Sequence, residues 1–241
     1  MFLLLPGFAL YFFYVSLAVL PAVLLLIYIY RQDKIEKEPM GLLLNLILRG
    51  VLAGFLSMIL ESVGTRILNL FNLDPESPLY KVLMAFLVVA AVEEGTKYFL
   101  MHRKVWNNPN FNFRFDGVIY AVFTSLGFAA MENILYAFGY GPGVLVSRAL
   151  LSIPGHMSFA VVFGIYYGRA RLKASMGQPD QARAAILKGY LLSILIHGLY
   201  DTCAMIGTVG LMLVFAVVVI VMYVLIFRTV RHEARTDQPV R

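Results

Sequence analysis

The sequence has few charged residues and a single cysteine. Only 14% of its 241 residues are Asp, Glu, Lys or Arg and 60% are hydrophobic, whereas soluble domains contain roughly 25% charged residues. A soluble domain of this length could not bury so much apolar surface, so that class is excluded. Cys203 has no second cysteine with which to form an intramolecular disulfide, so cysteine usage does not identify the redox compartment.

The first 30 residues also lack Lys and Arg, since the first charged residue is Arg31. A signal peptide begins with a positive segment and has a shorter apolar core than residues 2–30, so we expect an uncleaved helix. No polar stretch is long enough to fold separately, which predicts one integral membrane domain over residues 1–241. Its motif-bearing core is expected at about 80–206.

The apolar residues fall in runs of about 20, the length that crosses ~30 Å of hydrocarbon. This pattern predicts an all-α, polytopic transmembrane helix bundle of about seven helices, located in the cell membrane with the lipid bilayer around it. The expected spans are about 8–29, 41–61, 80–101, 115–138, 145–168, 189–206 and 208–227.

The net charge of +6 comes from basic residues that gather in every second loop. Residues 31–37, 103–114, 169–188 and 228–241 contain Lys and Arg, whereas residues 72–78 and 139–143 contain none. The positive-inside rule then places the N-terminus outside and the C-terminus in the cytosol, and we expect no nucleic-acid partner. The cytosolic tail, 228–241, is short and polar, and we expect it to be frayed.

Polar and charged residues interrupt four of the expected spans. Left unpaired at bilayer depth, such side chains would together cost on the order of 15 kcal/mol, at ~2.5–3.5 kcal/mol for each charge. We therefore expect them to face one another or a water-filled cavity, as the residues of an active site do. The candidate catalytic residues are Glu93, Glu94, Glu132, His156, His197 and Asp201, with Lys97 and Asn133 as supporting residues.

Glu93 and Lys97 are four residues apart, so they share a helical face and can pair. Glu94 is rotated by ~100° from Glu93, so we expect it to find another partner. Neighbouring carboxylates in a low dielectric resist ionising together, which suits one of them to transfer protons. The alternative is a Glu–Lys pair that only stabilises the helix.

The two intramembrane histidines each lie beside an informative residue. Asp201, four residues after His197, can accept from one imidazole nitrogen and leave the other for a proton or a metal. His156 follows Pro154, which removes a backbone donor, so we expect a kinked helix. The alternative for His156 is a hydrogen bond to a freed carbonyl. Asn133 is expected to hydrogen-bond between helices or to a substrate strand.

In this order on consecutive spans, the motifs resemble the PrsW family of intramembrane proteases, over roughly residues 90–205. This family is similar to the CAAX prenyl endopeptidases, whose pattern has a double glutamate, Phe-x-x-x-His and His-x-x-x-Asn. The chain departs from that pattern at Glu132 and Asp201, which argues against prenylated substrates. The motifs are Glu93-Glu94-x-x-Lys97, Phe128-x-x-x-Glu132-Asn133, the His156 helix and His197-x-x-x-Asp201.

The resemblance implies an intramembrane endopeptidase that cleaves a membrane-anchored protein substrate, such as an anti-sigma factor in stress signalling. In this hypothesis Glu93 activates the attacking water, and His197 stabilises the oxyanion or binds a metal. Glu132 and His156 complete the site. Glu132, His156 and His197 suit zinc or another divalent metal with an open position for water. The same groups can also act without a metal, and both alternatives stay open.

A proton- or ion-coupled membrane transporter is the main alternative, because buried acid–histidine chains also form proton relays. No internal repeat is visible, which counts against the common secondary-transporter architectures. Two adjacent glutamates followed by His-x-x-x-Asp fit a hydrolytic site better. A non-catalytic sensor or scaffold would not need so many buried charges.

The charge alternation generates a prediction about topology. Reporter fusions after Gly143 should report the outside, and fusions after Lys173 or Arg241 should report the cytosol, because the basic loops remain inside. Alkaline phosphatase and fluorescent-protein fusions measure this directly. A cytosolic signal at Gly143 would overturn either the helix count or the orientation.

Overall fold

The computed structural model describes the backbone of residues 4–240 and the side chains of residues 11–240. Over this range the chain is helical, and its only extended pairing is an isolated bridge between Phe113 and Pro239. The elements are α1 (Leu4–Gln32), α2 (Met40–Asn69), α3 (Pro78–Leu83), the π-helix η1 (Met84–Ala90), α4 (Ala91–Val105), α5 (Asp116–Tyr140), α6 (Val144–Leu150), α7 (Ser152–Ser175), α8 (Pro179–Ile206) and α9 (Val209–Arg235).

These elements form seven successive rods, because α3, η1 and α4 follow one another without a break and α6 leads directly into α7. Six of the rods are long and apolar enough to cross a membrane. The rod formed by α3, η1 and α4 is not among them, since it contains a π-helical segment and the charges Glu93, Glu94 and Lys97. The prediction of an all-α, multi-pass membrane protein is confirmed.

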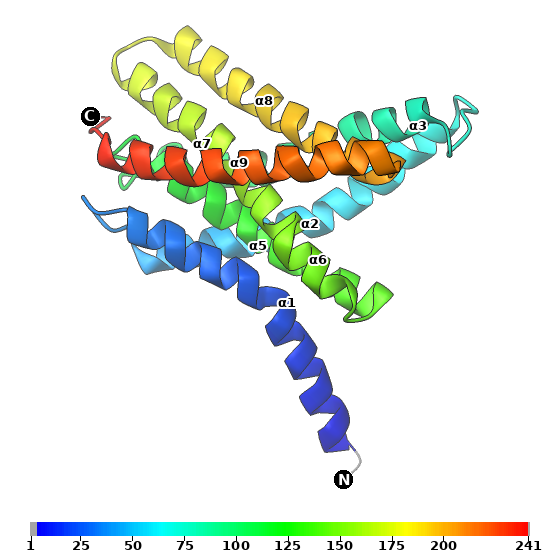
Figure 1. Ribbon diagram of the computed structural model, residues 1–241. Coiled ribbons are helices and arrows are strands. Elements are labelled where there is room, and N and C mark those ends of the chain that lie inside the picture. Colours follow the sequence, from blue (N-terminus) through cyan, green and yellow to red (C-terminus); the bar gives the residue numbers. More distant parts are fainter. Residues whose placement is uncertain (1–3, 241) are drawn as a thin grey trace.

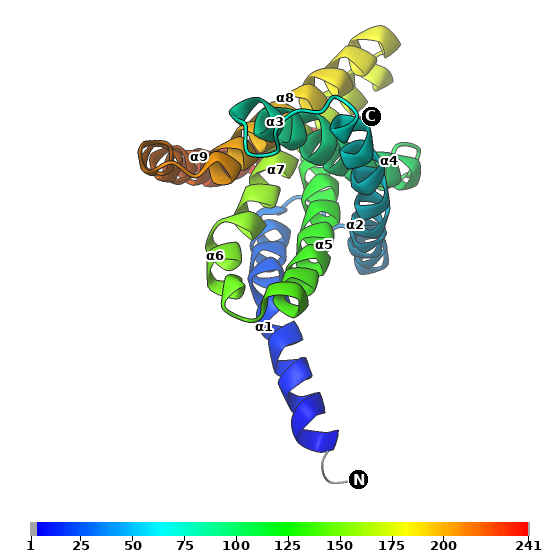
Figure 2. The same ribbon diagram turned by 90° about the vertical axis from the view of Figure 1, so that its right-hand side faces the viewer.

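Helix α5 lies in the middle of the bundle, with α2 on one side and α6 and α7 on the other (Figure 2). Helix α1 is bent along its length (Figure 1), and Pro21 inside it removes one backbone donor. Its N-terminal half projects away from the other helices. The central position of α5 matters for the site, because α5 carries Glu132 between the helices that carry the other polar residues.

Glycines let α5 approach its neighbours closely. A Cβ on Gly117 would lie 2.6 Å from the backbone nitrogen of Gly168 in α7, and a Cβ on Gly127 would lie 2.3 Å from the carbonyl oxygen of Ile47 in α2. Side chains at these positions would push the helices apart, as at small-residue contacts between transmembrane helices. Backbone contacts thus fix how closely α5, which carries Glu132, packs against α7, which carries His156.

The expectation of a frayed tail is wrong. Helix α9 continues to Arg235, and the residues after it pair with the loop before α5. The Phe115 N–H donates to Asp237 Oδ1 at 2.8 Å, and the Val240 N–H donates to the Asn112 carbonyl at 2.8 Å. Arg114 also forms an ion pair with Glu233 at 3.0 Å. Backbone groups that a frayed tail would leave to water are thus satisfied within the protein.

The kink expected near Pro154 is instead a break at Leu151, between α6 and α7. Pro154 lies in the first turn of α7, where a missing backbone donor is tolerated. The Tyr223 hydroxyl of α9 donates to the Leu150 carbonyl at 3.1 Å and to the Leu151 carbonyl at 2.8 Å. Helix α9 thus supplies a donor to the Leu150 carbonyl, which Pro154 leaves without one, whereas the Leu151 carbonyl also accepts from the Gly155 N–H at 2.9 Å.

Candidate active site

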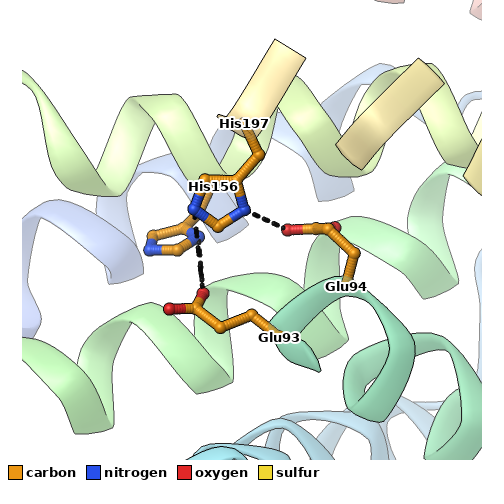
Figure 3. Close-up of side chains that lie close together, drawn as sticks. All are labelled: Glu93, Glu94, His156 and His197. Carbon is orange, nitrogen blue, oxygen red and sulfur yellow. Dashed lines mark hydrogen bonds and ion pairs between the residues drawn. The ribbon is translucent and has the colours of Figure 1, made fainter. Parts of the chain in front are cut away.

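The polar residues of four helices meet in the interior of the bundle. Glu93 and Glu94 lie in the first turn of α4, directly after η1, where a π-helical segment widens the rod. Such segments are frequent at functional sites. Figure 3 shows the two glutamates facing His156 of α7 and His197 of α8. The sequence gives no signal for η1, since its apolar residues are equally compatible with an ordinary α-helix.

Lys97 is the buried cation of this cluster. Its ammonium lies 2.5 Å from Glu94 Oε1 and 3.6 Å from Glu93 Oε2, and its side chain is 0% exposed. The pairing of Glu93 with Lys97 expected from the sequence is present, but the closer partner is Glu94, because the i,i+3 and i,i+4 positions both face Lys97. The expectation that Glu94 would depend on another partner alone is therefore corrected.

His197 contacts two carboxylates, one at each ring nitrogen. His197 Nδ1 lies 3.0 Å from Glu94 Oε1, and His197 Nε2 lies 3.3 Å from Asp201 Oδ2. The predicted contact of Asp201 with His197 is thus present, and Glu94 contacts the opposite ring nitrogen. The ring also stacks on Phe159, with 4.5 Å between centroids, so its orientation is fixed from three sides.

His156 connects Glu132 to the rest of the cluster. Its Nε2 lies 3.1 Å from Glu132 Oε2, and its Nδ1 lies 3.4 Å from the Lys97 ammonium and 4.0 Å from Glu93 Oε2. Asn133, next to Glu132, donates to the Ala18 carbonyl of α1 at 2.7 Å. Of the two roles expected for Asn133, the structure has the hydrogen bond between helices.

The site opens into a cavity of about 390 Å³ between α2, η1, α4, α5, α6, α7 and α8. Five of the six candidate catalytic residues line it, and the sixth, Glu94, is fully buried behind them. Sequence reasoning missed Glu61 and Arg148, which also line the cavity. Both are charges at the end of an expected span, a signal that allowed them to be read as interfacial residues.

The donor atoms present fit a divalent metal. Glu93, Glu94, His156 and His197 each offer one ligand atom, and these atoms lie within 4.8 Å of one another. Zinc bound at ~2.0–2.1 Å separates tetrahedral ligand atoms by ~3.4 Å, and Glu93 Oε2 is 4.0 Å from a nitrogen of each histidine. The Oε2 atoms of both glutamates are buried and accept no hydrogen bond from the described part of the chain.

This group shares His156 and His197 with the expected ligand set, but it has Glu93 and Glu94 in place of Glu132. Glu132 contacts His156 at Nε2, the ring nitrogen that faces away from Glu93. It therefore occupies the position from which a carboxylate orients a ligating histidine.

Membrane-spanning helices around a cavity lined by carboxylates and imidazoles are typical of intramembrane hydrolases. The comparisons with known proteins agree with this class. Residues 38–227 match the model of a family described as "PrsW family intramembrane metalloprotease". The chain belongs to the PrsW family of intramembrane proteases.

Curated relatives extend the likeness over most of the chain. Protease PrsW of Geobacillus kaustophilus is 35% identical over 191 residues, which cover 78% of this chain and 77% of the relative. Protease PrsW of Bacillus subtilis is 33% identical over 188 residues, with coverage of 78% and 80%. Protease PrsW of Clostridioides difficile is 29% identical over 214 residues, with coverage of 87% and 84%. No solved structure shows a significant match to the chain.

The position of Lys97 generates a prediction about stability. Lys97→Met should lower the free energy of unfolding by about 3–5 kcal/mol, because removing one partner of a buried ion pair leaves the other charge uncompensated. Adding Glu94→Gln should recover part of the loss, since it removes one of the unpaired charges. Denaturant unfolding in mild detergent micelles measures both effects.

The matched control is Lys81→Met. Lys81 pairs with Glu76 at 2.8 Å, but the Glu76 side chain is 85% exposed. Exposed pairs of this kind contribute about 0–1 kcal/mol. If Lys97→Met loses as little stability as Lys81→Met, the buried ammonium is dispensable.

Proposed function

We propose that this protein is an endopeptidase that cleaves a membrane-anchored protein at a peptide bond held within the bilayer. The observation that carries the proposal is the convergence of Glu93, His156 and His197 on one buried cavity. The family to which the chain belongs supports the reaction class. A transporter with the same buried groups finds no such support among the relatives.

Glu93 is our choice for the residue that accepts the proton of the attacking water. It lines the cavity, and its Oε2 atom accepts no hydrogen bond from the described residues. Its nearest cation, Lys97, is 3.6 Å away and is closer to Glu94. A carboxylate that lines the cavity and has a buried oxygen free of hydrogen bonds is suited to bind a water and take its proton.

Glu94 has a different role in this proposal. It is fully buried, it is paired with Lys97, and it contacts His197 Nδ1. A carboxylate in that position accepts from Nδ1 and holds the ring so that Nε2, on its far side, contacts Asp201 at 3.3 Å. Carboxylates at both ring nitrogens favour the doubly protonated ring, so when the substrate takes the place of Asp201 at Nε2, His197 donates a hydrogen bond to the oxygen of the scissile carbonyl as negative charge develops on it.

If a divalent metal is bound, Glu93, Glu94, His156 and His197 are the residues that would hold it. Such an ion polarises a carbonyl oxygen and makes bound water a stronger nucleophile at neutral pH. The contacts that orient the two histidines are the same with or without the metal, whereas Glu93 accepts the proton of the attacking water only where it is not a ligand. Glu94 orients His197, Glu132 orients His156, and the surrounding apolar helices limit the entry of bulk water.

The substrate class follows from where the site lies. A cavity enclosed by transmembrane helices receives a segment that is itself in the membrane, so we propose a protein anchored by a single transmembrane helix. An anti-sigma factor is an example of such a protein, and its cleavage would connect the enzyme to stress signalling.

The direct test is cleavage of single-span substrates by purified protein in proteoliposomes. Glu93→Gln should lower turnover by 10²–10⁴-fold, because it removes proton acceptance and preserves shape. Glu94→Gln should lower it by about 10–100-fold, as expected for a residue that orients another. Gel analysis and mass spectrometry of the products measure the rate and the cleavage position.

The control variant is Glu76→Gln, which removes an exposed carboxylate outside the site and should leave turnover unchanged. If Glu94→Gln is inactive while Glu93→Gln cleaves normally, the two roles are reversed. Normal cleavage by both variants would refute the protease mechanism.

Removal of metal gives an independent prediction. We expect near-stoichiometric zinc or another divalent metal in the purified protein, and we expect chelation to abolish cleavage, because the four donors fit such an ion. Elemental analysis of wild type and of the double variant His156→Ala/His197→Ala measures the bound metal. Full turnover by metal-free protein would leave Glu93 and water as the catalytic pair and remove the metal from the mechanism.

A further inference from the structure

Arg148 of α6 is a partly buried cation that the proposed mechanism does not use. Its Nη2 donates to Glu132 Oε2 at 2.7 Å and to Ser152 Oγ at 3.0 Å, and its Nε donates to Asn133 Oδ1 at 2.8 Å. The guanidinium also lies 3.8 Å from the centroid of the Tyr136 ring. One planar group therefore connects α5, α6 and the start of α7 at the wall of the cavity.

The contact with Glu132 leads directly to the proposed reaction centre. Glu132 Oε2 receives Arg148 Nη2 at 2.7 Å and faces His156 Nε2 at 3.1 Å, so the same oxygen atom contacts both groups. The other nitrogen of His156 faces Glu93 Oε2 at 4.0 Å. A rotation of the Glu132 side chain would remove the contact that holds the His156 ring in this orientation.

We propose that Arg148 is a positioning residue for peptide cleavage: it fixes the Glu132 carboxylate, and Glu132 in turn holds His156 with Nδ1 directed at Glu93. This proposal rests on the proposed function. An arginine suits the task because its planar fork donates to several acceptors at fixed angles, whereas a lysine is a single flexible point charge.

The backbone of α6 is held by contacts that do not involve the guanidinium. Leu145 packs against Ala18 of α1 and Ala137 of α5. The Tyr223 hydroxyl donates to the carbonyls of Leu150 and Leu151 at the end of α6. Loss of the Arg148 side chain is therefore expected to disturb Glu132 and His156 and to leave α6 in place.

The first test separates turnover from substrate binding. Arg148→Met should lower kcat by about 10–100-fold with KM within about twofold of wild type, the loss typical of residues that orient a reacting group. The kcat of Arg148→Lys should lie between that of wild type and that of Arg148→Met. The matched control is Arg114→Met, which breaks a half-buried ion pair with Glu233 at the other end of the molecule and should leave kcat unchanged. An increase in KM alone would overturn the proposal and make Arg148 a substrate contact.

The second test asks whether Arg148 acts through Glu132. In a double-mutant cycle, Arg148→Met should cost much less in kcat when Glu132→Gln is already present, because residues in one network are not additive. Additive losses would show that Arg148 acts elsewhere, and the proposal would fail.

The third test needs no substrate. The chain has four histidines, so the ring nitrogens of His156 can be assigned by NMR of histidine-labelled protein with single His→Gln variants. Arg148→Met should shift the His156 ring signals and leave those of His102 in place. Unchanged His156 signals would overturn the positioning role. Shifted signals in a protein that cleaves no substrate would support the positioning and refute the proposed function, so the two failures are distinguishable.

Discussion

The arrangement of the site depends on one buried ammonium group. Lys97 has no exposure to water, and it is close to Glu94, Glu93 and His156 at the same time. Two adjacent glutamates in the interior of a membrane protein would repel each other and each would have a high desolvation cost. A lysine one helical turn further along reduces both costs, because its side chain reaches back along the face that the two glutamates share.

The Lys97 ammonium lies closer to Glu94 than to Glu93, and this difference gives the two carboxylates different chemical roles. Glu94 has the shorter ion pair and a histidine partner, so both of its contacts favour a fixed, ionised state. Glu93 has a longer contact and an oxygen without a hydrogen bond, facing a cavity. Sequence spacing alone predicted that Lys97 would pair with Glu93 and that Glu94 would have another partner. Spacing relates only positions on an ideal helix and contains no information on side-chain rotamers.

Much of the fold followed from the sequence, because spans of apolar residues have a physical length that the bilayer imposes. The convergence of the polar residues also followed, since isolated charges at membrane depth are too costly to leave apart. Three features did not follow from the sequence: the π-helical segment before Glu93, the break at Leu151 and the pairing of the C-terminal residues. Each depends on a contact between distant segments, such as the hydrogen bonds from Tyr223 to the end of α6.

Arg148 is a further residue whose contacts could not be predicted from the sequence. A single charge near the end of a span is usually explained by its side chain reaching the interface, and nothing in the local sequence contradicts that explanation. Its contacts with Glu132, Asn133 and Ser152 exist because α6 folds back beside α5 and the start of α7. Each histidine of the site thereby has a carboxylate partner with its own cation, Glu94 with the buried Lys97 and Glu132 with the partly buried Arg148. Of these three glutamates, Glu93 lies between the two histidines and has the longest contact with its cation, 3.6 Å to Lys97, which suits it to accept a proton in the cavity.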